Sequence, residues 1–168
     1  MLQVVFDAGP LITSCKFSVR GRLVLDFVLD GCSVTIPSAV GGEVMRAPTK
    51  FEDAREARQR VDTGKIQVAM PQPDPSMQAI LDLYGLGEGE EQSILLMHQQ
   101  EFTSLIVDDH LAYLVADRLR VSKRFFLDLI VCLQQAGQLN VTDARAIVHA
   151  VQPRYPPAFV EHTFRMLG

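Results

Sequence analysis

The sequence predicts an α/β fold built around a central, mainly parallel sheet that helices cover on both faces. Short β-branched or apolar runs alternate along the chain with segments whose apolar residues recur every three or four positions, as in amphipathic helices. The chain has 168 residues, 48% of them hydrophobic, and no internal repeat or obvious linker. This length and composition suffice for one compact domain with a hydrophobic core.

Four apolar runs are the strand candidates, because each is short and is bounded by polar or turn-forming residues. They are QVVF (3–6), SVTI (33–36), IQVAM (66–70) and SLIV (104–107), and a short edge strand is expected near Val121.

Helical patterns fill the intervals between these strands and the whole chain beyond the fourth strand. The first group comprises PLITSCKF (10–17), RLVLDFVLD (22–30), PSAVGGEVMRA (37–47), EDAREARQRVD (52–62), SMQAILDLYG (76–85) and EEQSILLMHQQ (90–100). The second comprises HLAYLVADRL (110–119), RFFLDLIVCLQQAG (124–137), TDARAIVHAVQ (142–152) and PPAFVEHTFRML (156–167). We therefore expect one domain over residues 1–168, in which residues from about 140 form a C-terminal helical extension.

Composition narrows the class of protein. No apolar stretch approaches the roughly 20 residues that span a bilayer, and the N-terminus lacks a signal-peptide pattern, so we expect a cytoplasmic protein without a membrane segment. Cys15, Cys32 and Cys132 are odd in number and widely spaced among apolar neighbours, which predicts buried free thiols. The net charge of −4 argues against binding nucleic acid by bulk charge, although a local basic patch could still hold a phosphate backbone.

Acidic residues follow two of the predicted strands at the point where each strand ends. Asp7 comes directly after the first strand, and Asp108 and Asp109 follow the fourth. Ligands of parallel α/β sheets bind outside the carboxyl ends of the strands. If the first and fourth strands are neighbours, these carboxylates converge on one place.

Two further acids stand near the starts of predicted helices. Glu43 lies in the helix after the second strand, and Glu90, followed by Glu91, lies at the start of the helix before the fourth strand. Carboxylates that converge repel one another unless a cation neutralises them. Because the ligands are all oxygen, with no nearby His or Cys pair, Mg²⁺ or Mn²⁺ is the expected cation.

Four short motifs resemble, in order and spacing, those of the PIN-domain nucleases, and the match is closest to the VapC-like branch with DAGPLI and GE signatures. The motifs are VVFDAGPLI, VTIPSAVGGEV, LGEGEEQSILL and LIVDD, and the resemblance covers roughly residues 3–135. It implies a three-layer α/β/α sandwich, metal-dependent hydrolysis of RNA, and frequent membership of toxin–antitoxin pairs.

The resemblance also implies roles for individual residues. The expected catalytic residues are Asp7, Glu43, Glu90, Asp108 and Asp109, and the expected metal ligands among them are Asp7, Glu90 and Asp108. Which of the two adjacent aspartates ligates the metal stays open at this point. Two departures from the family pattern concern the grip on the substrate: Gly9 stands where many members have Ser or Thr, and Tyr113 stands where this branch often has Arg.

Each acid also has a purely structural interpretation. Asp7, Asp108 or Asp109 could cap the helix that follows it, and Glu88, Glu90 and Glu91 could complement a helix dipole. Glu43 could be a solvated helix residue. His98 and His110 lack the i, i+4 partner of zinc hydrolases and are expected to be structural. The segment 51–60 reads as a solvated helix face, whereas RLRVSKR (118–124) is the better candidate to bind phosphate.

We therefore expect a Mg²⁺- or Mn²⁺-dependent endoribonuclease in which a metal-activated water attacks the phosphodiester in line. Single-stranded or looped RNA is the expected substrate, and a homodimer and an antitoxin protein are the expected partners. The dimer rests on the apolar helices 22–30 and 156–167. The alternative is a non-catalytic binding or regulatory module with a degraded site. An aspartyl phosphohydrolase is disfavoured because its DxDxT motif is absent.

Overall fold

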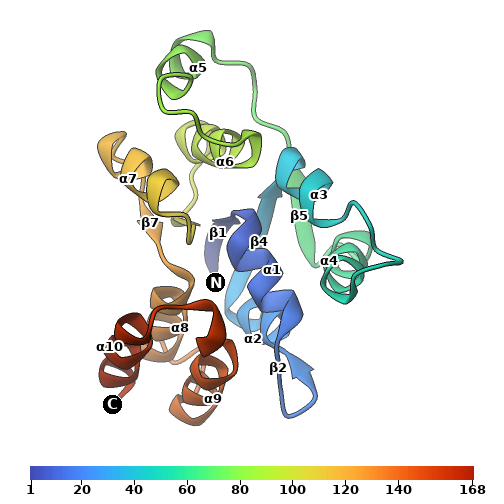
Figure 1. Cartoon of the computed structure of the whole chain (residues 1–168), viewed down its shortest axis with the longest axis vertical. Coiled ribbons are helices and arrows are strands. Elements are labelled where there is room, and N and C mark those ends of the chain that lie inside the picture. The colour runs from blue at the N-terminus through green and yellow to red at the C-terminus, as the bar shows by residue number, and fades with distance from the viewer.

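A five-stranded sheet in which all neighbouring strands run parallel forms the centre of the computed structural model, which describes residues 1–168. The strand order is β5-β4-β1-β6-β7 (Figure 1). These strands are β1 Leu2–Phe6, β4 Cys32–Pro37, β5 Ile66–Ala69, β6 Ser104–Ile106 and β7 Lys123–Arg124. Helices lie on both faces, so the predicted three-layer α/β/α fold with a parallel sheet is confirmed.

The helices follow the predicted order with small shifts of their ends. They are α1 Ala8–Lys16, α2 Val24–Gly31, α3 Ser38–Val44, α4 Glu52–Asp62, α5 Pro75–Leu81, α6 Glu88–Gln99, α7 His110–Arg118, α8 Phe126–Gln135, α9 Val141–Val151 and α10 Pro157–Leu167, with a 3₁₀ turn at Gln152–Arg154. None of the helices is both long enough and apolar enough to traverse a lipid bilayer.

Alternating side chains of β1 divide the hydrophobic interior between the two faces of the sheet, as the two-residue period of a strand requires. Val4 and Phe6 belong to the larger core, to which α1, α2, α8, α9 and α10 contribute. Val5 belongs to the smaller core, which α6 and α7 complete. Both faces of β1 are therefore buried, and β1 is held between β4 and β6.

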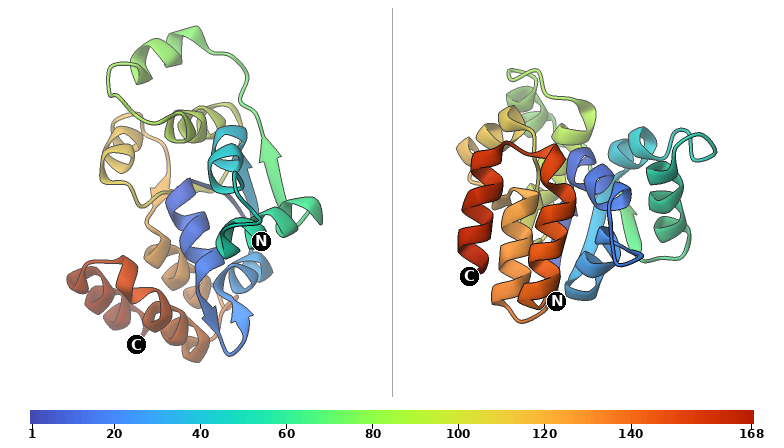
Figure 2. Two further views of the ribbon diagram at one scale, coloured as in Figure 1. Left: turned by 45° about the vertical axis from the view of Figure 1, so that its right-hand side comes forward. Right: turned by 60° about the horizontal axis from the view of Figure 1, so that its bottom comes forward.

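The last three helices pack against one another beside the sheet (Figure 2). Helix α8 follows β7 and contributes Phe126 and Leu129 to the larger core. Helices α9 and α10 cover α8, and the turn between them carries Tyr155 back toward the carboxyl edge of the sheet, where it contacts Asp108. This return of a distant segment matters for the site described below.

A two-stranded hairpin of β2 (Ser18–Val19) and β3 (Arg22–Leu23) interrupts the segment between α1 and α2, and it was not expected from the sequence. Its turn uses positive φ angles at Arg20 (51°) and Gly21 (76°), the backbone that a two-residue hairpin loop requires. The edge strand expected near Val121 is present two residues later, as β7.

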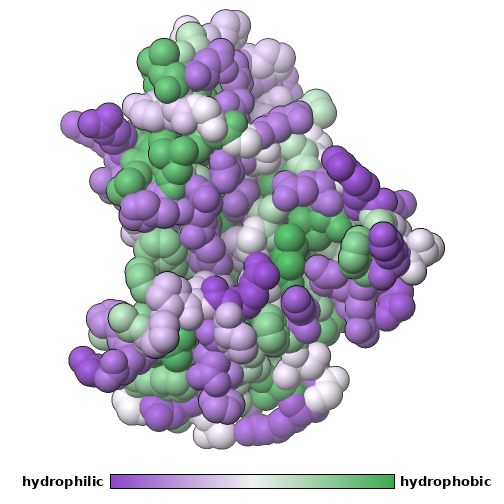
Figure 3. All heavy atoms as spheres, viewed as in Figure 1, coloured by the Kyte–Doolittle hydropathy of each residue, from purple (hydrophilic) through white to green (hydrophobic).

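The surface carries several exposed apolar side chains, many of which gather over α5 and α7 (Figure 3). They include Ile80 and Leu83 at the end of α5, and Leu111 and Leu114 on α7. The cysteines are free, as predicted, with Cys15 and Cys32 buried and Cys132 half-buried.

Candidate functional site

A cavity of about 690 Å³ opens at the carboxyl edge of the sheet, and its polar lining is mostly acidic. We call it the acidic cavity. Its carboxylates come from four separate segments of the chain: Asp7 from the end of β1, Glu43 from α3, Glu88 and Glu90 from α6, and Asp109 from the segment before α7. The convergence expected from the sequence occurs because β1 and β6 are neighbours.

Asp7 lies deepest in the acidic cavity, with only 5% of its surface exposed. Its backbone N–H donates to the carbonyl of Ile106 (3.0 Å), which ties the end of β1 to β6. Although Asp7 stands immediately before α1, its side chain makes no capping hydrogen bond to that helix. The interpretation of Asp7 as a simple helix cap therefore has no support in the geometry.

The pKa of Asp7 is raised to about 7, chiefly because burial disfavours the charged carboxylate. The nearby backbone N–H of Ala8 offsets this in part, whereas the negative charges of Glu90, Glu43 and Asp109 raise the pKa further. The pKa of Glu90 is also raised, first by burial and then by the charges of its acidic neighbours. Like charges thus act on one another across the acidic cavity.

Glu43 and Glu90 are brought together by close packing of α3 against α6. A Cβ atom added to Gly89 would lie 3.0 Å from Val40 Cγ2 and 3.8 Å from Glu43 Oε2, so the absent side chain lets the two helices approach. Gln92 of α6 also stabilises the contact between α3 and α6. Its Oε1 accepts hydrogen bonds from Ser38 Oγ and from the backbone N–H of Ala39, both at 3.0 Å.

Glu90 and Asp109 each serve a helix end as well as the acidic cavity. Glu90 Oε2 accepts from the backbone N–H of Gly87 (2.8 Å) at the start of α6, and Asp109 Oδ1 accepts from the backbone N–H of Ala112 (2.8 Å) at the start of α7. These bonds fix the direction of both carboxylates. The capping role and the site role are therefore compatible for these two acids.

The structure turns the side chain of Asp108, one of the expected metal ligands, away from the acidic cavity. Its Oδ1 accepts from the backbone N–H of Phe126 (2.9 Å), and its Oδ2 accepts from the hydroxyl of Tyr155 (2.7 Å). Successive side chains of an extended segment point to opposite sides. Asp109, rather than Asp108, therefore joins Asp7, Glu43 and Glu90.

Glu91 is turned outward as well: its Oε2 accepts from Gln78 Nε2 (2.8 Å) on α5. By contrast, Arg46 lines the acidic cavity, is exposed, and forms no ion pair. The sequence reasoning missed Arg46. Its position three residues after Glu43 could have indicated that it lies near the site, although α3 ends between the two residues.

Two basic side chains of the segments singled out from the sequence have structural contacts. Lys123 pairs with Asp117 and lies over the ring of Tyr113, 5.3 Å from its centroid. On α4, Arg60 is largely buried and pairs with Asp26 (2.8 Å), which attaches this helix to α2. The α4 segment is thus more than a solvated face.

The donor set suits a hard divalent cation, since carboxylate oxygens from four segments face one cavity and Asp7 has no capping partner. The carboxylates do not form a closed ligand cage: no three Asp, Glu, His or Cys side chains stand close enough together to hold an ion directly. An ion that keeps several of its waters, as Mg²⁺ does, is compatible with such spacing.

The fold and the site define an α/β protein of the kind that binds its ligand outside the carboxyl ends of parallel strands, here at an acidic cavity. Within that class the sequence matches the family DUF3368, described as a PIN domain, over residues 3–163, and the chain belongs to this PIN-domain family. PIN domains are generally nucleases.

No curated protein matches the sequence. Among solved structures, the chain is similar to "a domain of a functionally unknown protein from Methanocaldococcus jannaschii DSM 2661", with 19% identity, 74% of this chain and 91% of that chain covered, and a TM-score of 0.47.

Proposed function

We propose that the protein is a metal-dependent ribonuclease that hydrolyses phosphodiester bonds of single-stranded or looped RNA in the acidic cavity. The observation that carries this proposal is the convergence of Asp7, Glu43, Glu90 and Asp109 on one open cavity, with Asp7 buried and without a capping partner. Membership of a family of nucleases supports the same reaction. A cavity at a sheet edge admits a splayed strand more readily than a rigid duplex.

Asp7, Glu43, Glu90 and Asp109 would hold Mg²⁺ or Mn²⁺. When bound, such an ion supplies the positive charge that activates water and stabilises charge on a phosphodiester in the transition state. The chain itself orients the carboxylates, through the bonds of Glu90 to Gly87 and of Asp109 to Ala112. Arg46 offers a guanidinium to phosphate oxygens at the rim of the acidic cavity.

Asp7→Asn tests this function. The variant should lose cleavage of a fluorescent single-stranded RNA in Mn²⁺, because it removes a ligand charge. It should also lose most of the rise in melting temperature that Mn²⁺ gives the wild type by binding only the folded state. The matched control is Asp82→Asn, an exposed aspartate outside the acidic cavity. Wild-type cleavage and metal response in Asp7→Asn would refute the metal site.

A non-catalytic PIN module is the second candidate, and the absence of three carboxylates close enough to hold an ion directly favours it. Crystals soaked in Mn²⁺ separate the two. Anomalous density between Asp7 and Asp109 supports the nuclease, whereas RNA binding without cleavage and without such density supports the module.

We also propose that the protein acts as the toxin of a toxin–antitoxin pair. The negative charge of the acidic cavity supports this, because a basic side chain of a partner helix could neutralise the carboxylates in place of metal. The exposed apolar residues over α5 and α7 offer such a helix a surface. The mass of the assembly purified from its native operon tests the partner.

A further inference from the structure

A second cavity, of about 240 Å³, lies on the other side of Asp108 from the acidic cavity. We call it the aromatic pocket. Its lining includes Asp108, His110, Phe125, Tyr155 and Phe159. Its volume is below the roughly 300–1,000 Å³ of pockets that enclose drug-sized ligands, so it suits a small planar group of one or two fused rings.

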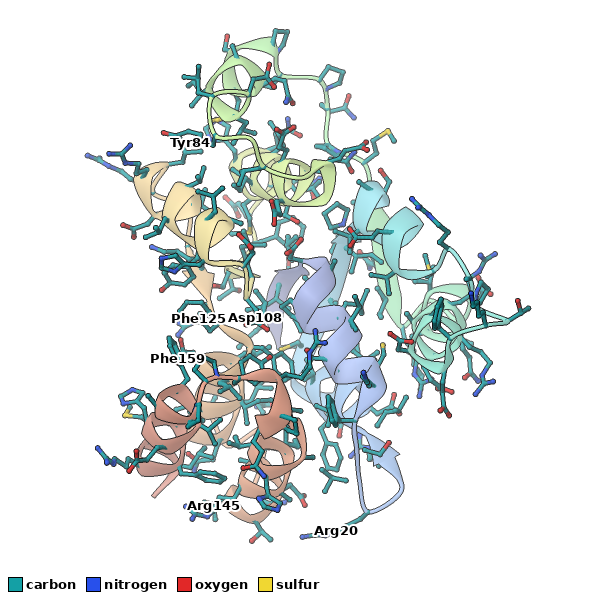
Figure 4. The ribbon with its side chains drawn as sticks, viewed as in Figure 1. Arg20, Tyr84, Asp108, Phe125, Arg145 and Phe159 are labelled. Carbon is teal, nitrogen blue, oxygen red and sulfur yellow. The ribbon has the colours of Figure 1, made fainter.

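Phe125 and Phe159 form the aromatic walls, and Figure 4 shows both near Asp108, between α7 and α10. Their ring centroids are 5.5 Å apart with an interplanar angle of 79°. The ring of Tyr113 is stacked on the ring of Phe125, with the centroids 4.2 Å apart and an interplanar angle of 1°. Phe159 is 47% exposed, so one wall is accessible from solvent.

Asp108 provides the polar group of the aromatic pocket, and its direction is fixed by the two hydrogen bonds from Phe126 and Tyr155. A carboxylate offers about four acceptor positions, and these two bonds use only part of them. A ligand that satisfies the rest must bring N–H or O–H donors. An anion is disfavoured by the carboxylate itself.

Two charged side chains outside the lining of the aromatic pocket act on Asp108. They are Arg154, whose positive charge also acts on Tyr155, and Asp128, whose charge is negative. Arg154 is exposed and forms no ion pair. A neutral ring attached to a phosphate could donate hydrogen bonds to the Asp108 carboxylate inside the aromatic pocket. Its phosphate could pair with the guanidinium of Arg154.

The aromatic pocket and the acidic cavity share a wall. Gly9 lines the acidic cavity, and a Cβ atom added to it would lie 3.8 Å from Asp108 Cβ, which belongs to the aromatic pocket. Asp108 and Asp109 are also consecutive residues that face the two cavities separately. The aromatic pocket and the acidic cavity are therefore neighbours at the carboxyl edge of the sheet.

We propose that the aromatic pocket binds one unpaired nucleobase of the RNA, beside the cleaved bond, and prefers guanine to uracil. This inference rests on the proposed ribonuclease function. Unstacked bases of single-stranded RNA are recognised by aromatic side chains and by hydrogen bonds to their edges. Guanine presents two adjacent N–H groups to a carboxylate, whereas uracil presents one N–H between two carbonyl oxygens that repel it.

The test measures binding of the full-length protein in EDTA, so that no RNA is cleaved. Its probes are short fluorescent oligoribonucleotides, either uridine throughout or with one central guanosine, read by fluorescence anisotropy. Wild type should bind the guanosine-containing strand more tightly. Phe159→Ala should weaken that binding about tenfold, within the range that aromatic stacking on a base contributes. Phe51→Ala, which removes a similarly exposed phenylalanine outside the aromatic pocket, should change nothing.

Asp108→Asn should abolish the preference for guanosine without abolishing binding of the uridine strand. Because Asn cannot accept both native hydrogen bonds in the same way, its melting temperature is measured first, and Phe159→Ala decides the question if Asp108→Asn is unfolded. Equal affinity of wild type and Phe159→Ala for both strands would refute the base pocket and leave the nuclease standing.

Two other outcomes distinguish a failure of the base pocket from a failure of the proposed ribonuclease function. Preference for guanosine that depends on Phe159, together with absence of cleavage in Mn²⁺, would support the pocket and refute the nuclease. Competition of the labelled strand by arginine amide but not by guanosine monophosphate would refute the base pocket and assign it to a side chain of a protein partner.

Discussion

Asp7 is a carboxylic acid that the fold holds where its neutral form is favoured. It is buried, and three other carboxylates act on it across the acidic cavity. A nuclease that binds a cation there gains from this arrangement, because the ion relieves the repulsion. Without metal, the same arrangement costs stability, and the cost depends on pH.

The pH dependence of unfolding checks this. The pKa of Asp7 is about 7 in the folded protein and near 3.8 when unfolded, so both states hold the proton only well below pH 3.8. As pH rises from about 4 to 7 the unfolded state releases its proton first, and stability falls by up to about 4 kcal/mol. Asp7→Asn should flatten that part of the stability curve of metal-free protein.

Urea unfolding in EDTA at several pH values gives this curve. The Asp82→Asn control should keep the wild-type slope. A wild-type stability that is constant or rises between pH 4 and 7, with the same behaviour in Asp7→Asn, would show that burial and the neighbouring carboxylates do not raise the pKa of Asp7.

Asp108 and Asp109 mark the limit of prediction from sequence at the scale of the residue. Two adjacent acids after a strand predict that one of them reaches the site, and this holds. Which one does so depends on Tyr155, 47 residues further along the chain, whose hydroxyl holds Asp108. No local pattern near residue 108 contains that information.

At the scale of elements, Gln92 joins α6 to the beginning of α3, and these helices carry Glu90 and Glu43. Gln92→Ala removes the acceptor of the Ser38 and Ala39 hydrogen bonds. We expect a loss of about 1–3 kcal/mol of stability and a larger proportional loss of RNA cleavage, because the two glutamates are no longer held together.

Gln135→Ala is the matched control, since Gln135 is exposed on α8 and its side chain forms no hydrogen bond. Urea unfolding and cleavage rates are compared for the three proteins. If the cleavage rate of Gln92→Ala falls only in proportion to its fraction of folded protein, Gln92 acts on stability alone.

The elements that the sequence predicted correctly have strong local patterns. The apolar runs of β1, β4 and β6 are buried in the sheet, and the helices between them are amphipathic. The β2–β3 hairpin escaped prediction because its strands have two residues each and its turn is Arg-Gly rather than one of the usual Asn-Gly or Asp-Gly pairs.

At the scale of the molecule, only one of the two apolar helices from which a homodimer was expected is available to a partner. The apolar residues Val24, Leu25 and Val28 of α2 are buried within the protomer, so α2 has no apolar face left for a partner. Helix α10 does expose apolar side chains, Phe159 at 47% and Met166 at 48%. The predicted homodimer therefore depends on α10 alone.

Light scattering of the purified protein should give the mass of a dimer, and Met166→Glu should give that of a monomer, because it would place a charge in an apolar interface. Leu83→Glu, at an exposed position on the α5 side, is the control. A monomer at high micromolar concentration, or dissociation by Leu83→Glu instead, contradicts this assignment. Purification from the native operon adds the mass of an antitoxin if one binds.

The opposite directions of Asp108 and Asp109 make the length of one short segment critical. Deleting Val107, which lies between the end of β6 and the two acids, would shift both acids by one position. Because side chains of an extended segment alternate, Asp109 would then take the place of Asp108 beside Tyr155 and the aromatic rings, and Asp108 would point to the opposite side. Loops at a sheet edge usually tolerate changes in length. The segment between β6 and α7 is expected to tolerate substitutions that line the aromatic pocket, with a change in the RNA sequence that the protein prefers. An insertion or deletion in this segment is expected to disable both cavities at once.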